Sequence, residues 1–335
     1  LGLWLWLKAT PERHPGRGEH VHVGSWSVAG AQPLSLRHLA AGAACIAANF
    51  GCRPTFALSA LLCFPIFWPQ ITSLLQGLKS RSLPPRKALR APAAVIIPAL
   101  IVVLPLMAYN VARFGSPLDF GNDYQMTVTD MTRFVQPTAN FLPSVGAYLF
   151  LPLRFTSEFP FIGMMPIAFR EWGYYEPMAG GLFATCPLLL LALAAPFLRR
   201  RMHRSGYWGL ATCSLALAVL LTVFDSHTAG LGWRYICDFG WMMAIAALVP
   251  MLYLMHPDGD AIVAGAPDPS ERNEPRRDVT KRHPMMLACV RGLVVAALMA
   301  SIILAVLACF IPGRDDSLIN NNPVLYDTVV AWFRL

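Results

Sequence analysis

The sequence predicts an all-α integral membrane protein, in which a polytopic bundle of membrane helices carries an outer segment of short interfacial helices. Composition is the first observation behind this prediction. Of the 335 residues, 56% are hydrophobic and only 14% are charged, whereas about a quarter of a soluble domain is charged. The second observation is that apolar residues gather in windows of roughly 20, the helix length that crosses a hydrocarbon core about 30 Å thick.

Six such windows are predicted to span the membrane. Four are strongly apolar and cover residues 93–112, 178–198, 207–224 and 286–310. A fifth, 236–255, carries Asp238 in its first turn, and a sixth, 55–76, contains two prolines. Ahead of the sixth, residues 36–51 are rich in Gly and Ala but short for a crossing. Small residues let helix backbones approach closely, so this stretch predicts a short or tilted helix packed against others.

The cations set the predicted orientation of these spans. Basic residues cluster at span ends, in segments 79–90, 199–204 and 272–282. The positive-inside rule places these segments in the cytoplasm. Alternation of the spans then puts residues 8–37 inside, and puts residues 52–54, 113–177, 225–235 and the tail after Ile311 outside. The net charge of +8 therefore belongs to span ends and does not indicate nucleic acid as a partner.

The predicted organisation follows from this topology. Residues 1–35 are the end of a truncated helix and a flexible cytoplasmic linker, because the chain opens with Leu1 inside an apolar run. We therefore expect the later part of a longer protein, or a start site assigned too late. The remaining parts are membrane helices (36–112), an outer segment (113–177), membrane helices (178–255), a cytoplasmic loop (256–284), a membrane helix (285–310) and an outer tail (311–335).

The outer segment 113–177 is too long for a simple connection and is rich in aromatic residues and prolines. Such a segment is predicted to lie along the outer surface as short amphipathic pieces, with its rings at headgroup level. Arg154 and Glu158 have helical spacing and are read as solvated charges on one such piece. The segment could roof a cavity that opens toward the lipid.

A charge pair stands at the start of the fifth span. In the stretch GWRYICD, Arg234 precedes Asp238 by four residues, which sets both on one helix face within pairing reach. Two interpretations stay open. The pair is an interfacial salt bridge that anchors the helix start, or Arg234 binds an anionic headgroup and Asp238 orients it. Asp225 and His227, on the same predicted outer loop, are read as solvated loop residues.

Two further arginines are predicted at the outer level. Arg53 lies at the apex between two apolar helices, where it contacts phosphate or snorkels to the interface. Arg113 ends a span and faces the motif FGSPLDFGNDYQM. In that motif Asp119 and Asp123 are compatible with a general base or a divalent metal, but Asp and Asn beside Gly are also ordinary turn chemistry. No cofactor is predicted, and the scattered cysteines are read as small core residues.

Four stretches carry a resemblance to a known family. They lie between residues 38 and 245 and read GAACIAANFGCRPT, YNVARFGSPLDFGNDYQM, LPLRFTSEFPFI and GWRYICD. In pattern and order they resemble the later half of bacterial polytopic glycosyltransferases of the GT-C class, the group similar to dolichyl-phosphate-mannose protein mannosyltransferases. The resemblance implies an enzyme of the bacterial cytoplasmic membrane. It would transfer a hexose from a polyprenyl-phosphate donor to an acceptor at the outer face, by an inverting displacement. Enzymes of that class carry their acidic catalytic residue in the first outer loop, which has no counterpart here, so no catalytic residue is assigned.

The working hypothesis combines the resemblance with the charges. Arg53, Arg113 and Arg234 are expected to bind the donor phosphate, with Tyr235 and Asp238 orienting Arg234. The expected partners are the polyprenyl-phosphate lipid, the sugar acceptor and membrane lipids. A non-catalytic membrane scaffold and a transporter are the alternatives. A transporter predicts ionisable groups near span centres and internal repeats, and the sequence shows neither except for Arg291, which can snorkel inward.

Overall fold

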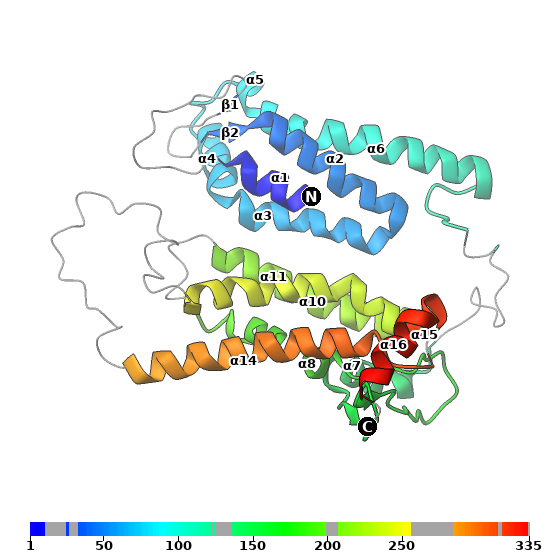
Figure 1. Cartoon of the computed structure of the whole chain (residues 1–335). Coiled ribbons are helices and arrows are strands. Elements are labelled where there is room, and N and C mark those ends of the chain that lie inside the picture. The colour runs from blue at the N-terminus through cyan, green and yellow to red at the C-terminus, as the bar shows by residue number, and fades with distance from the viewer. Residues whose placement is uncertain are drawn as a thin grey trace. The chain divides into compact units, whose positions relative to one another are not determined.

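The computed structural model describes residues 1–10, 25–26, 33–121, 124, 136–198, 207–255, 284–313 and 317–333. Three predicted segments lie mostly or wholly outside these residues: the linker at 8–35, the loop at 256–284 and the basic turn at 199–204. Within the described residues almost all regular structure is helical, and each strand is only two residues long (Figure 1). The predicted all-α class is confirmed.

The chain divides into two compact units, Leu1–Phe134 and Val135–Leu335. Each unit is described by itself. The division falls inside the predicted outer segment, so the motif after Arg113 belongs to the first unit and the aromatic-rich remainder to the second.

The first unit is built around three packed helices, α1 (Gly2–Ala9), α2 (Leu36–Cys52) and α6 (Arg90–Phe114). Its other elements are β1 (Ser25–Trp26), β2 (Leu34–Ser35), η1 (Pro54–Leu62), α3 (Cys63–Ile66), α4 (Trp68–Lys79) and α5 (Pro85–Ala88). A Cβ atom at Gly2 would lie 3.1 Å from the carbonyl oxygen of Gly42, and one at Gly42 would collide with the Trp6 ring. This close approach confirms the prediction of a helix packed through small residues.

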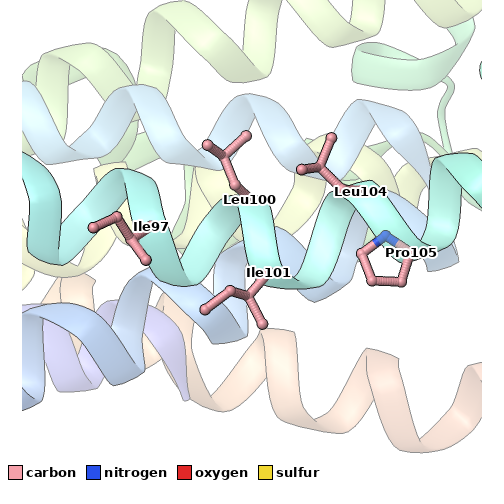
Figure 2. A pocket seen from close by; sticks show the side chains of 5 residues that line it. All are labelled: Ile97, Leu100, Ile101, Leu104 and Pro105. Atoms are coloured by element: carbon pink, nitrogen blue, oxygen red, sulfur yellow. The ribbon is translucent and has the colours of Figure 1, made fainter.

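Prolines shape the apolar elements of this unit. Pro54–Ile66 and Trp68–Lys79 are bent by 67° at Phe67, and Pro69 lies in the first turn of the second piece. A proline there favours a new helix start because it has no N–H to donate. Helix α6 continues through Pro98 and Pro105. One face of it forms an open, fully apolar hollow lined by Ile97, Leu100, Ile101, Leu104 and Pro105 (Figure 2).

The second unit packs an antiparallel pair of long helices, α10 (Tyr207–Thr228) and α11 (Ile236–Met255), against its other elements (Figure 1). These are α7 (Thr138–Phe150), β3 (Arg154–Phe155), β4 (Ile162–Gly163), α8 (Leu182–Thr185), η3 (Pro187–Ala194), η5 (Trp233–Tyr235), α14 (Pro284–Ala308), α15 (Leu318–Asn321) and α16 (Pro323–Phe333). Arg291 of α14 donates from Nε to the carbonyl of Leu254 at 2.9 Å. The cation thus meets a carbonyl near the end of α11, where the helix leaves such acceptors unsatisfied.

Four helices among the described residues are long and apolar enough to cross a membrane: α6, α10, Trp233–Met255 and Ala288–Ala308. The bent pair would make a fifth if it counts as one span. The chain is therefore an integral membrane protein. The predicted span at 178–198 is not among these helices, because Pro187 and the extended Cys186 before it separate the short α8 from the 3-10 helix η3.

Two smaller predictions are wrong. Arg154 and Glu158 do not share a helix, because Arg154 lies in β3, which pairs with β4 through Arg154–Gly163 and Phe155–Ile162. The cysteines are not core residues either. All are free, Cys45, Cys63, Cys186 and Cys213 are half-buried, and Cys52, Cys237, Cys289 and Cys309 are exposed. Cys63 packs against the core cluster around Trp6 without being fully buried.

Candidate functional site

Helix α7 is the scaffold of the site in the second unit. It presents Asn140 and Tyr148 on one buried face, because they are eight residues, or about two turns, apart. The Asn140 amide donates to the carbonyl of Glu171 at 2.9 Å and accepts from the Glu171 N–H at 3.4 Å. This helix therefore fixes the start of the extended segment 171–178.

Tyr148 fastens the α10–α11 turn, residues 229–232. Its hydroxyl donates to the carbonyl of Gly230 at 3.0 Å and accepts from the N–H of Gly232 at 2.9 Å. Burial, above all, raises the pKa of Tyr148 far above its usual value, so the hydroxyl keeps the proton that it donates. Gly230 has φ +83°, and a Cβ atom there would lie 2.5 Å from the carbonyl oxygen of Tyr174. The turn can adopt this conformation only with glycine at that position.

The extended segment pairs with this turn. The N–H of Leu231 donates to the carbonyl of Tyr174 at 3.0 Å, and the N–H of Glu176 donates to the carbonyl of Leu231 at 2.8 Å. Alternate residues of an extended chain point to the same side. Tyr174 and Glu176 therefore project together toward the start of α11.

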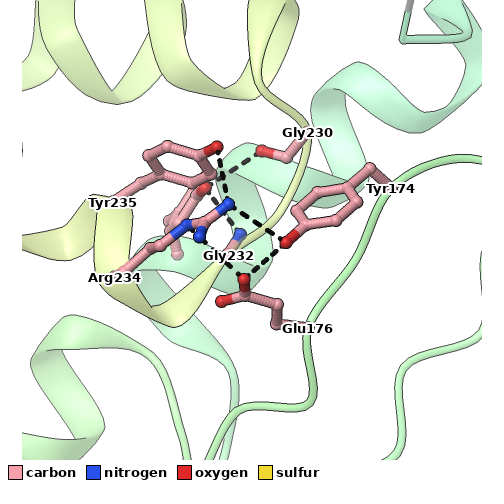
Figure 3. Close-up of polar contacts among 7 residues, drawn as sticks. Tyr174, Glu176, Gly230, Gly232, Arg234 and Tyr235 are labelled. Carbon is pink, nitrogen blue, oxygen red and sulfur yellow. Dashed lines mark hydrogen bonds and ion pairs between the residues drawn. The ribbon is translucent and has the colours of Figure 1, made fainter. Parts of the chain in front are cut away.

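These side chains meet Arg234 in what we call the Arg234 cluster, formed by Tyr174, Glu176, Arg234 and Tyr235 (Figure 3). Nε of Arg234 lies 3.5 Å from Oε1 of Glu176, and Nη2 donates to the hydroxyls of Tyr174 at 3.3 Å and Tyr235 at 3.4 Å. The Tyr174 hydroxyl donates to Glu176 at 2.5 Å. The guanidinium carbon lies 5.2 Å from the Tyr235 ring centroid. The cation is thus held by one carboxylate and two aromatic rings.

The cluster keeps an accessible positive charge. The side chain of Arg234 is 62% exposed and that of Glu176 is 31% exposed. Burial, together with the hydrogen bond to Glu176 and the charge of that carboxylate, raises the pKa of Tyr174 to about 12. Tyr174 is therefore a neutral donor at neutral pH. An anion that approaches Arg234 meets an exposed guanidinium.

Asp238 lies apart from the exposed cation. Its side chain is 1% exposed, one turn deeper in α11, and the ion pair of Arg234 is with Glu176. The acidic partner of Arg234 therefore comes from a segment far away in sequence, and the role expected for Asp238 beside Arg234 stays a prediction. Glu176 is not among the site residues that the sequence predicts. The signal available was the spacing of Tyr174 and Glu176, two residues apart in a non-helical stretch that ends at Pro177.

The predicted loop 225–235 also needs correction. Helix α10 continues to Thr228, so Asp225 and His227 lie in its last turn and not in a loop. Asp225 is buried, and its charge adds to the effect of burial in raising the pKa of Tyr148. His227 is exposed and sets its ring edge against Phe141, with centroids 6.1 Å apart.

The first unit holds a second arginine arrangement, the Arg113 site, formed by Tyr109, Arg113 and Phe114. Nη1 of Arg113 donates to the Tyr109 hydroxyl at 2.9 Å, and the guanidinium carbon lies 4.8 Å from the Phe114 ring centroid. Oδ1 of Asp119 accepts from the Gly121 N–H at 2.7 Å, which is a turn contact. Asp123 lies outside the described residues, within which no group of three potential metal ligands occurs.

Arg53 is half-buried between α2 and η1. It caps α2 in an extended conformation, its N–H donates to the Asn49 carbonyl at 2.9 Å, and Pro54 begins the next element as the sequence predicts. Arg53 and Arg113 belong to the first unit and the Arg234 cluster to the second. The common phosphate site predicted for the three arginines stays a prediction.

No family model, no curated protein and no solved structure matches this chain.

Proposed function

We propose that this chain acts in a multi-pass membrane glycosyltransferase that takes its sugar from a polyprenyl-phosphate donor at the outer face of the bacterial cytoplasmic membrane. The observation that carries the proposal is the Arg234 cluster, an exposed guanidinium oriented by aromatic rings at the first residues of an apolar helix. A lipid phosphate arrives at the same depth, because its headgroup lies where a span begins.

The geometry of Arg234 suits a phosphate. A guanidinium offers parallel N–H groups that match two phosphate oxygens, and such charge-assisted bonds are about 2.7–2.9 Å long. The bonds from Nη2 to Tyr174 and Tyr235 are 3.3 and 3.4 Å. These long bonds can be exchanged for shorter ones to an anion, while Glu176 keeps Nε in place.

The arrangement would also serve the chemistry. In sugar transfer from a lipid phosphate, the bond between the sugar and the phosphate breaks and negative charge grows on the leaving phosphate. A cation already in position stabilises that developing charge. In this proposal Arg234 stabilises the leaving group, Tyr174 and Tyr235 hold Arg234, and no residue is assigned as the base.

Binding of undecaprenyl phosphate to the full chain in nanodiscs tests the proposal. Hydrogen bonds to charged groups contribute about 1.5–3 kcal/mol, so Arg234→Gln is expected to weaken binding roughly 10- to 100-fold. The matched control is Arg154→Gln, which removes the same charge from an exposed strand of the same unit. Equal affinities of the two variants would remove Arg234 from the donor site and favour a non-catalytic scaffold.

A further inference from the structure

The last described helix, α16, belongs to the second unit and packs against other elements of it. α16 (Pro323–Phe333) has 11 residues, which make it about 16 Å long at 1.5 Å per residue. A crossing of the hydrocarbon core needs roughly 20 residues. This helix is therefore too short to span a membrane, although its sequence, PVLYDTVVAWF, holds one charged residue, Asp327.

One side of α16 is attached to the protein through aromatic contacts. The Phe333 ring stacks on Phe159 with centroids 4.5 Å apart, and the Tyr326 ring lies 6.4 Å from that of Phe310. Val330, between them on the same side, is buried. The spacing of four and three residues defines one helix face. This face docks α16 on the β3–β4 hairpin and on the residues that follow α14.

The opposite side of α16 is apolar and uncovered. Val324 is 75% exposed, Leu325 is 46% exposed and Trp332 is 72% exposed. Thr328 and Ala331 lie between them on the helix surface and are also exposed. An apolar surface of this kind marks a binding site for a partner or for a membrane.

We infer that the occupant of this face is the bilayer itself, and that α16 lies in the interfacial plane with Trp332 at headgroup level. The first support is position. Phe310, on which Tyr326 rests, comes two residues after the end of the candidate span Ala288–Ala308. α16 is thereby held at the height where that span leaves the hydrocarbon.

The second support is chemistry. Tryptophan is enriched where its ring meets the headgroups and its N–H meets water. A helix with an apolar face that cannot span is held in the interface by its buried area. α16 carries no Lys or Arg, so its attachment depends on apolar contact and needs no anionic lipid. The inference does not rest on the glycosyltransferase proposal.

Photocrosslinking of the full chain in phosphatidylcholine nanodiscs tests the inference. We expect Trp332→p-benzoylphenylalanine to give, after irradiation, a mass increase equal to one phosphatidylcholine. Tyr326→p-benzoylphenylalanine, on the docked face, is the matched control and is expected to give severalfold less lipid adduct. Crosslinks from position 332 to this chain or to another protein, or equal lipid yields at both positions, would overturn the inference.

Depth is measured separately with brominated phosphatidylcholines. The part of the tryptophan emission that disappears in Trp332→Phe reports on Trp332 alone. Bromines near the headgroup are expected to quench this part more strongly than bromines deep in the acyl chains. Stronger quenching by the deep bromines, or no quenching by either, would contradict an interfacial position. This variant keeps an aromatic residue, so it preserves the packing of α16.

Discussion

The Arg113 site and the Arg234 cluster both hold an arginine side chain in place, but with residues from different parts of the sequence. Each holds an arginine against a tyrosine hydroxyl and an aromatic ring at the end of an apolar helix. Arg113 does so with residues of its own helix, four positions before and one after. Arg234 is held also by Tyr174 and Glu176, about 60 positions away. The first arrangement follows from local sequence, whereas the second depends on a tertiary scaffold.

The carboxylate is the second difference. Glu176 pairs with Arg234, whereas within the described residues no carboxylate pairs with Arg113. Exposed ion pairs contribute about 0–1 kcal/mol. Glu176 therefore adds little to stability, and its main effect is on the position of Arg234 and on the local charge. The contrast predicts that substitutions which disturb contacts between distant segments displace Arg234 and leave the Arg113 site unchanged.

The largest expected effect is on the turn that positions Arg234. Gly230→Ala adds a Cβ atom 2.5 Å from a backbone oxygen at a residue with φ +83°, and strain and overpacking cost about 1–3 kcal/mol each. We expect unfolding in mixed detergent micelles to become easier by about 2–4 kcal/mol. The matched change in the other site is Gly115→Ala, with φ +77° and no atom within 4 Å of the added Cβ. It should lower the free energy of unfolding by only about 1–2 kcal/mol. Equal losses of stability in the two variants would contradict the proposed difference between the two sites.

The next effect separates the two tyrosines. Tyr148→Phe leaves the buried Gly232 N–H without its acceptor, and an unsatisfied buried group costs about 1–3 kcal/mol. Tyr109→Phe removes one exposed hydrogen bond to Arg113, which water replaces. We expect the first variant to lower the free energy of unfolding by at least about 1 kcal/mol and the second to leave it nearly unchanged. A loss of the same size in both would mean that Tyr148 does not fasten the turn.

A smaller effect concerns the carboxylate. Glu176→Gln removes a negative charge 3.5 Å from Arg234, and two charges about 4 Å apart near a protein surface interact by about 1 kcal/mol or more. A bound phosphate would no longer be repelled, so affinity for undecaprenyl phosphate should rise by about fivefold. Glu158→Gln, in the turn of the hairpin, is the control with the same charge change and should leave affinity unchanged. A weaker complex with Glu176→Gln would show that holding Arg234 in place matters more for binding than the repulsion of the phosphate.

The smallest effect isolates Tyr174. Its pKa is raised from 10.0 to about 12, first by burial and then by Glu176. Because the folded-state value is the higher one, the contribution of Tyr174 to stability is complete below pH 10 and is lost as the pH rises through about 12. Phenolate absorbance, taken as the difference from Tyr174→Phe, should show this titration and should shift to lower pH in Glu176→Gln. An unshifted titration would remove Glu176 as a cause.

The sequence predicts those parts of the molecule that local pattern determines. Long apolar windows locate α6, α10, α11 and α14, because hydropathy over 20 residues is a property of one segment. The many small residues of 36–51, mostly Ala, predict the close packing of α2 for the same reason.

Local patterns do not predict which distant segments of the chain pair with each other. The window 178–198 is as apolar as a span, but Pro187 interrupts it. Arg154 and Glu158 have helical spacing, yet a hairpin with Ile162 and Gly163 decides their conformation. The contact of Tyr148 with Gly230 joins residues 82 positions apart. Arg234 and Tyr235 were therefore found from their own span, whereas Glu176 and Tyr148 were not.

The most direct test of the central claim is to locate the bound phosphate. A polyprenyl phosphate ester with a photoreactive group on the phosphate, bound to the full chain in nanodiscs, would label the residues around it. We predict adducts in the peptides that contain Glu176 and Arg234, and their loss in Arg234→Gln but not in Arg154→Gln. Labelling that persists in Arg234→Gln, or that falls only outside the peptides with Glu176 and Arg234, would contradict the account.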